Sequence, residues 1–107
     1  MEKKKQFVYV LSLVPRLYDD SAWSKTDEDI VDRHFVRLKN YTKEGKVVLA
    51  GRTLNNASES FGLVIFEAAS KEEAYEFMMG DPAVEEGIMI AKLFPSSVAL
   101  LRNDRAL

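Results

Sequence analysis

The sequence has no cysteine and only one histidine, and these two scarcities exclude several kinds of chemistry. Without cysteine there is no disulfide framework, no thiol nucleophile and no thiolate zinc site. A single histidine makes a zinc centre improbable, because such centres draw several ligands from histidine and cysteine. The five glycines form no dinucleotide-binding or phosphate-binding motif, and no G-x-S-x-G element occurs. We therefore expect no metal and no cofactor.

The chain also lacks an excess of one charge and lacks a long apolar run. Fifteen Lys and Arg stand against 17 Asp and Glu, which argues against binding to nucleic acid or to an anionic membrane. Residues 7–14 follow three lysines and resemble the start of an export signal. That run is far shorter than the roughly 20 residues that span a bilayer, and no small-residue cleavage site follows. The expected location is cytoplasmic.

What remains is an ordinary globular composition. The chain has 107 residues, of which 47% are hydrophobic and 30% charged. That length is typical of one domain with a thin core. We predict a single domain over residues 1–107, with a core of about 7–101 and short tails at 1–5 and 102–107.

The order of secondary structure predicts an α+β fold. Runs rich in β-branched and aromatic residues predict strands over 7–14, 47–50, 63–66 and 88–94, with a short fifth strand at 98–101. Capping patterns at 26–29 and 70–73 predict two helices, which end at Gly45 and Gly80. The order βαββαβ is that of a ferredoxin-like fold, in which both helices cover one face of an antiparallel sheet.

The predicted strands are apolar on both faces. Leu63 and Ile65 would point to one face of the sheet, and Val64 and Phe66 to the other. Two helices cover one face only, so we expect a homodimer through the open face, a dimeric α+β barrel. The alternative is that the C-terminal segment folds back over the sheet, but residues 98–101 are too few to cover it.

The lone histidine lies inside the first predicted helix. At about 100° per residue, His34 falls in the same arc as Ile30, Leu38 and Phe35, and it points toward the sheet. One interpretation is a core histidine that makes a single hydrogen bond. The other is a general acid or base, because histidine titrates near neutral pH.

Four further residues each allow two interpretations. Asp81 precedes Pro82 and suits a helix N-cap, but it could also be the carboxylate partner of a histidine. Tyr18 and Trp23 could form a lid over a ring-shaped substrate, or they could anchor their own loop. Arg52 could bind a substrate carboxylate or phenolate, or it could form a surface ion pair.

Four segments carry a resemblance to the YCII-related family of small dimeric α+β barrel proteins. They are residues 34–39 (HFVRLK), 44–51 (EGKVVLAG), 70–74 (SKEEA) and 81–84 (DPAV) with Gly87. The resemblance implies that His34 and Asp81 form a catalytic dyad in a pocket. Arg52 departs from the proline that many relatives carry there, and the loop 16–25 is longer. A relative's substrate is therefore a poor guide to the substrate of this chain.

Two functions follow as hypotheses. The first is a cofactor-free enzyme of the lyase or isomerase type that acts on a small cyclic or aromatic acid. His34 would move the proton and Asp81 would orient it, while Arg52 and the loop with Tyr18 and Trp23 would hold the substrate. The second is a module that binds or senses a small molecule without catalysis.

Overall fold

The computed structural model describes residues 4–102 and has the predicted α+β fold. The strands form a four-stranded sheet of order β2-β3-β1-β4, and every neighbouring pair is antiparallel. The strands are β1 (Lys5–Leu13), β2 (Val47–Arg52), β3 (Gly62–Ala68) and β4 (Met89–Ser96). The helices are α1 (Lys25–Glu44), α2 (Lys71–Met79) and α3 (Pro82–Glu85), with two 3₁₀ turns at Pro15–Tyr18 and Asp20–Ala22. The βαββαβ order is confirmed, with α3 as a short addition after α2.

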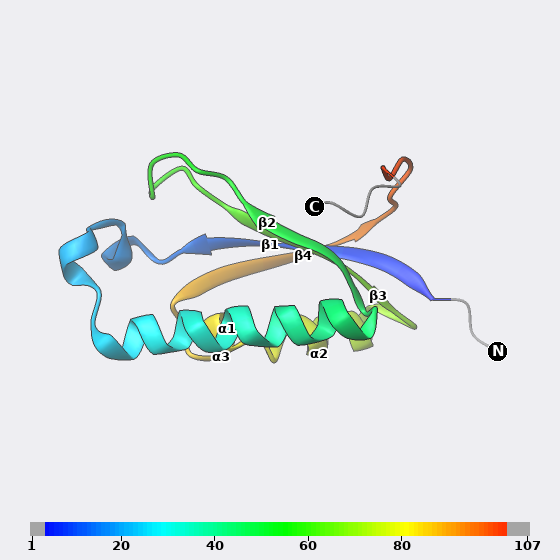
Figure 1. Ribbon diagram of the computed structural model, residues 1–107, viewed down its shortest axis with the longest axis horizontal. Coiled ribbons are helices and arrows are strands. Elements are labelled where there is room, and N and C mark those ends of the chain that lie inside the picture. Colours follow the sequence, from blue (N-terminus) through cyan, green and yellow to red (C-terminus); the bar gives the residue numbers. More distant parts are fainter. Residues whose placement is uncertain (1–3, 103–107) are drawn as a thin grey trace.

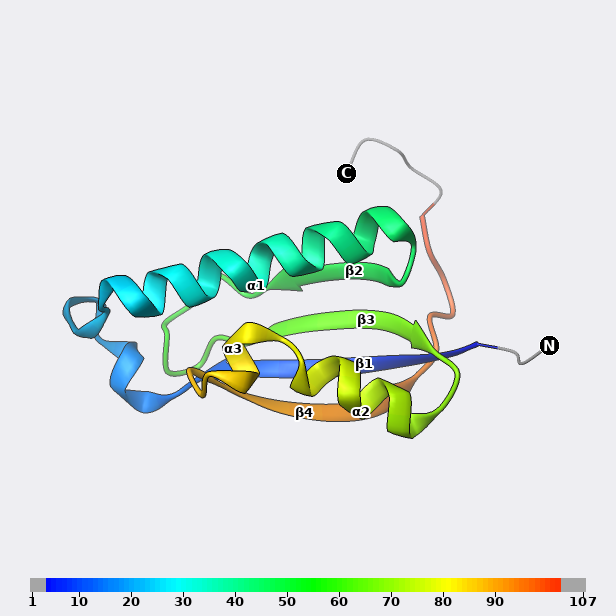
Figure 2. The same ribbon diagram turned by 90° about the horizontal axis from the view of Figure 1, so that it is seen from below.

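All three helices lie on one face of the sheet (Figure 1). Seen from that side, α1 runs along β2, while α2 and α3 lie over β1 and β4 (Figure 2). The link between α2 and α3 therefore faces the middle of α1 on the same, helix-covered side of the sheet. Within residues 4–102 no helix is long and apolar enough to cross a membrane.

The predicted strands need several corrections. The strands predicted at 47–50 and 63–66 are longer, 47–52 and 62–68. The first strand begins at Lys5 instead of residue 7. The last strand continues through Pro95 to Ser96, because β4 is an edge strand, where a proline costs no ladder hydrogen bond. The predicted fifth strand is absent: residues 98–101 are irregular, and the amide of Val98 donates to the Gln6 side chain at 2.7 Å. The predicted tails lie mostly outside the described residues.

Helix α1 begins two residues earlier than predicted. Its N-cap is Ser24, whose hydroxyl accepts from the amide of Asp27, while the Asp27 carboxylate accepts from the amide of Ser24. Arg16 binds the same carboxylate with both terminal nitrogens, at 2.8 and 3.0 Å. The bidentate pair holds the pKa of Asp27 well below its usual range. At the other end, Gly45 has a φ of 91°, which glycine adopts without strain.

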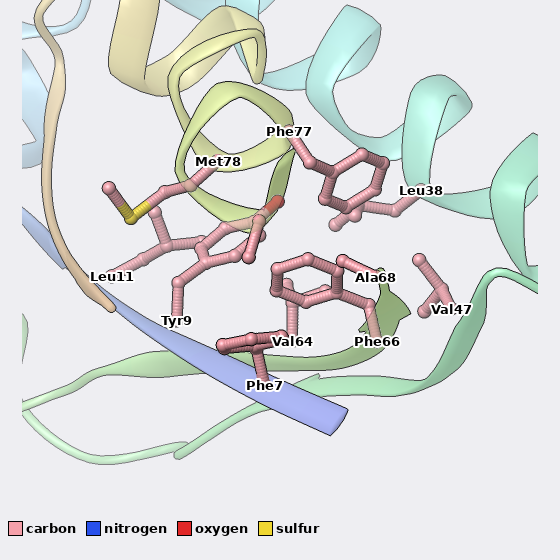
Figure 3. Packing of buried hydrophobic residues seen from close by; sticks show 11 residues of the cluster. Phe7, Tyr9, Leu11, Leu38, Val47, Val64, Phe66, Ala68, Phe77 and Met78 are labelled. Atoms are coloured by element: carbon pink, nitrogen blue, oxygen red, sulfur yellow. The ribbon is translucent and has the colours of Figure 1, made fainter. Parts of the chain in front are cut away.

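The core lies between the sheet and the helices (Figure 3). Alternate residues of β1 and β3 point into it, among them Tyr9 and Phe66, and α2 contributes Phe77. The ring centres of Phe66 and Phe77 are 4.7 Å apart, and the ring of Tyr9 meets Phe66 edge-on at 5.6 Å. Burying aromatic rings in this way is a large stabilising contribution for a small domain. One member of this core, Tyr9, carries a polar hydroxyl.

Within residues 4–102 no segment covers the other face of the sheet. That face presents seven apolar side chains: Val8, Val10, Leu49, Leu63, Ile65, Ile90 and Phe94. Ile90 is 53% exposed and Phe94 46%. This arrangement agrees with the two-sided apolar pattern of the sequence. Dimerisation through this face stays a prediction.

Candidate active site

Asp81 is a fully buried carboxylate in the link between α2 and α3. Its side chain is 0% exposed, and it caps α3 by accepting from the amide of Ala83 at 3.0 Å. Pro82 takes the first position of that helix, where a proline needs no hydrogen bond. The capping role expected from the Asp-Pro sequence is therefore present. The remaining acceptor positions of the carboxylate are directed away from α3, toward α1 and the sheet.

His34 supplies the second hydrogen bond of this carboxylate. Its Nδ1 lies 2.6 Å from Oδ1 of Asp81, across the space between α1 and the link that carries Asp81. The structure thus brings together the two residues that the sequence singled out. Asp81 serves both as a helix cap and as the partner of the histidine.

Tyr9 supplies the third hydrogen bond, from the central strand β1. Its hydroxyl donates to Oδ2 of Asp81 at 2.7 Å, and the tyrosine is itself fully buried. Burial raises the pKa of the Tyr9 hydroxyl most, and the adjacent negative charge of Asp81 raises it further. Tyr9 therefore keeps its proton and acts as a fixed donor to the carboxylate.

These contacts determine the charge of Asp81. Burial by itself raises the pKa of Asp81, but the hydrogen bonds from His34, Tyr9 and the Ala83 amide outweigh it and hold the pKa below its ordinary value. An ionised carboxylate only accepts hydrogen bonds, so Nδ1 of His34 must carry the proton. The free ring nitrogen, Nε2, is then the atom that can take up a proton.

Nε2 of His34 is the unpaired nitrogen of a partly exposed side chain. The His34 side chain is 14% exposed, and Nε2 makes no hydrogen bond within residues 4–102. In the same part of the chain, the only fully buried side-chain nitrogen or oxygen without a partner is Nη1 of Arg37. Nε2 is consequently not sealed in the core. An exposed, unpaired ring nitrogen whose tautomer is held by a carboxylate is the arrangement of a general acid or base.

Arg52 lies on the same face of the sheet as this pair. It is directly opposite Gly62, in register with Leu11 on β1, at the end of β2. Those positions point to the face that the helices cover. The residue is exposed and makes no hydrogen bond or ion pair to any described residue. The surface ion pair considered from the sequence is thus absent here, although no contact joins Arg52 to His34 or Asp81.

The loop between β1 and α1 separates its two aromatic residues. Trp23 is half-buried and donates from Nε1 to the carbonyl of Leu17 at 3.0 Å, and it packs beside Ile30 and Ala83. It anchors the loop next to the residues that flank the candidate site. Tyr18 is 39% exposed and is the freer of the two rings.

Helical periodicity predicted the burial of Phe35 wrongly, and strand periodicity did not reveal the role of Tyr9. Phe35, expected in the buried arc, is 64% exposed because it lies at the edge of that arc. Tyr9 lies in the predicted first strand, and the sequence alone gives it no role beyond a place on one face of the sheet. A tyrosine at a fully buried strand position is itself a signal, because its hydroxyl needs a polar partner in the core.

Comparison with known proteins now gives the family. A model of the YCII-related domain matches residues 11–95, which include every residue of the site except Tyr9. The chain belongs to the YCII-related domain family. A similar solved structure is 5-chloro-2-hydroxyhydroquinone dehydrochlorinase (TftG) from Burkholderia phenoliruptrix AC1100, in complex with 2,5-dihydroxybenzoquinone. Its TM-score is 0.64 at 17% identity, covering 86% of this chain and 93% of that one, so it supports the fold. The comparison with curated proteins returned no match.

Replacing Asp81 with alanine should destabilise the protein by about 3–4 kcal/mol at pH 7. The change removes a helix cap and leaves the buried hydroxyl of Tyr9 without its acceptor. Because the pKa of Asp81 is lowered in the folded state, its contribution is present above the unfolded pKa and is lost as the pH falls through the folded pKa. Urea denaturation at pH 7 and at pH 3 should therefore show a smaller difference between variant and natural protein at pH 3.

Asp32→Ala is the matched control, because Asp32 is an exposed residue of α1 without a hydrogen bond to any described residue. It should change stability by no more than about 0.5 kcal/mol. Equal effects of the two substitutions would contradict a structural role for the Asp81 network.

Proposed function

We propose that this protein is an enzyme that performs acid–base chemistry, of the lyase or isomerase type, on a small aromatic or quinone-forming acid. The observation that carries the proposal is the 2.6 Å contact of His34 Nδ1 with a buried carboxylate, while Nε2 stays unpaired and accessible. In this proposal Nε2 of His34 takes a proton from the substrate and returns it at another atom or to solvent. Asp81 holds the ring and stabilises the imidazolium that forms.

Dehydrochlorination of a chlorinated hydroxyhydroquinone is the first reaction to test, since a structurally similar protein carries that name. Loss of HCl turns such a ring into a hydroxyquinone by two proton movements: one hydroxyl proton is moved to the chlorine-bearing carbon, a second hydroxyl proton goes to the base, and chloride leaves that carbon with the electron pair of the C–Cl bond. The departing chloride accounts for the oxidation of the ring. The step therefore needs no separate oxidant and is compatible with an acid–base site alone.

Two further elements fit a phenolate-bearing substrate. Arg52, at the end of β2 on the helix-covered face, is a cation without an ion-pair partner among residues 4–102, and it suits a phenolate or carboxylate oxygen. The loop with Tyr18 and Trp23 is anchored beside the residues that flank the site and would limit access of water to it. We propose that Arg52, Tyr18 and Trp23 bind the substrate and that His34 transfers the substrate's proton.

Binding without catalysis is the second candidate, and one observation favours it. The carboxylate of Asp81 is fully buried and already bound by three donors, as expected of a structural cap. In that case the site would hold a metabolite and His34 would only hydrogen-bond to it.

A panel of chlorinated hydroxyhydroquinones separates the two candidates. Release of chloride, with the absorbance of a quinone appearing at the same rate, is expected from the enzyme. Calorimetric binding of 2,5-dihydroxybenzoquinone with no chloride release from the panel would support the binding module instead. Neither binding nor release would overturn the choice of substrate class.

A further inference from the structure

Arg37 is a half-buried cation on α1, one turn after His34, and it has no carboxylate partner within residues 4–102. Its Nη2 donates to the carbonyl of Phe77 at 2.8 Å. Its Cζ lies 4.4 Å from the ring centre of Phe77 and 5.2 Å from that of Tyr41. Its Nη1 is buried and makes no hydrogen bond to any residue that the structure describes. Withdrawing a charge from water without a counter-charge is costly, so this placement calls for a compensating interaction.

Gly80 provides the space for this guanidinium. The φ of Gly80 is −82°, an ordinary value that any residue can adopt, so the backbone itself does not require glycine. A Cβ atom at this position would lie only 3.1 Å from Nη2 of Arg37. Since Gly80 directly precedes Asp81, the guanidinium lies against the backbone segment that carries the buried carboxylate.

The Tyr9 hydroxyl connects the two charges. The Tyr9 ring packs against Phe77, the same ring that Arg37 covers, and its hydroxyl donates to Asp81. Burial and Asp81 raise the pKa of Tyr9, whereas the positive charge of Arg37 acts in the opposite direction. The hydroxyl therefore lies within the influence of both the cation and the carboxylate.

We propose that Arg37 is the counter-charge of Asp81, acting through the Tyr9 hydroxyl, and that it keeps His34 neutral in the resting site. A buried carboxylate with no cation nearby would draw a proton onto His34 and hold it there as an imidazolium. With Arg37 in place the carboxylate is already balanced. The inference rests on the proposed function, in which His34 must be neutral to accept a proton. Arg37 is thus a positioning residue that acts through Tyr9 and Asp81.

Two other cations near this network are each paired with carboxylates. Arg33 on α1 binds Asp29 and, beyond α3, Glu86. Lys46, whose Nζ is 5.1 Å from the Phe77 ring centre, binds Glu73 on α2. These pairs are largely balanced and more exposed. Among the described residues no carboxylate pairs with Arg37, which is half-buried, whereas Arg52, also unpaired, is exposed at the end of β2.

The single histidine allows a direct test, because its ring signals in an NMR titration need no assignment. We expect Arg37→Met to raise the titration midpoint of His34 by roughly 0.5–1 pH unit relative to the natural protein. Arg37→Lys keeps the charge and should shift the midpoint by less than half as much. Asp81→Asn removes the attracting charge and should move the midpoint downward.

Two tyrosine variants complete the test. Tyr9→Phe keeps the ring packing but breaks the link, so the midpoint should rise as in Arg37→Met. Tyr41→Phe is the control: it removes the hydroxyl of the other ring that Arg37 covers. Among the described residues that hydroxyl makes no hydrogen bond to Asp81, so the midpoint should stay unchanged. If Arg37→Met does not fold, Arg37→Gln and Tyr9→Phe decide the question.

An unchanged midpoint in a folded variant that lacks Arg37 or the Tyr9 hydroxyl overturns the inference. Equal shifts in Arg37→Met and Arg37→Lys also overturn it, because they would indicate packing instead of charge. The titration uses no substrate, so its outcome is independent of the chloride assay. A protein that shows the expected shifts but releases no chloride would lose the proposed reaction and keep the charge network.

Discussion

Replacing His34 with asparagine should lower turnover by about 10²–10⁴-fold and leave the fold intact. That range is typical for loss of a general acid or base. The amide nitrogen of asparagine stands close to the position of Nδ1 and can still donate to Asp81, so the buried carboxylate keeps its hydrogen bond. The group that disappears is Nε2, the accessible atom to which proton transfer is assigned. The measurement is the rate of chloride release on the chlorinated hydroxyhydroquinone that the natural protein converts.

A pair of variants shows whether His34 and Asp81 act as one unit. Asp81→Asn should also reduce turnover, because an amide no longer favours the imidazolium. The double variant should be no slower than His34→Asn alone, since the carboxylate acts only through the ring. Multiplied effects in the double variant, or a His34→Asn variant with unchanged turnover, would contradict the assignment.

Much of this fold is predictable from local patterns. Gly45, Gly80 and the Asp81-Pro82 pair each end or begin an element where expected. Gly45 does so through its positive φ, and the Asp81-Pro82 pair through the N-cap and the first helical position. The errors arise where tertiary context decides. Pro95 does not end its strand, since that depends on whether the strand lies at an edge of the sheet. Phe35 lies at the margin of the apolar arc of α1, where helical periodicity cannot distinguish covered from exposed positions.

The site was predictable only in part, for a physical reason. His34 and Asp81 are 47 positions apart, and their meeting depends on how α1 packs over the sheet. The family resemblance supplied that pairing, and helical periodicity could not. Tyr9 and Arg37 were missed because each also satisfies an ordinary pattern, a core strand residue and a helix cation. Their arrangement is visible only in the folded chain, where the Tyr9 hydroxyl donates to Asp81 and the Arg37 guanidinium lies against Phe77 and Gly80.

The open face of the sheet leads to the last prediction, a change of molecular mass in solution. We propose that two copies pack through this face, because its apolar side chains lie on all four strands and remain partly exposed in a single chain. Exposed apolar patches of this extent in small proteins mark interaction surfaces. The surface that needs covering is a sheet face, and a second copy presents the same face. The natural protein should sediment near twice 12.1 kDa at low micromolar concentration.

Ile65→Lys should shift that mass to near 12.1 kDa. Ile65 lies on β3, inside the sheet, so the lysine would be placed within the interface. In a two-fold interface the substitution occurs twice, and burying unpaired charges there costs several kcal/mol, which raises Kd by at least about 100-fold. Val36→Lys is the control, since Val36 is 53% exposed on α1, away from the open face. Dissociation by Val36→Lys and not by Ile65→Lys would place the interface on α1, and a natural protein that sediments as a monomer would exclude the dimer altogether.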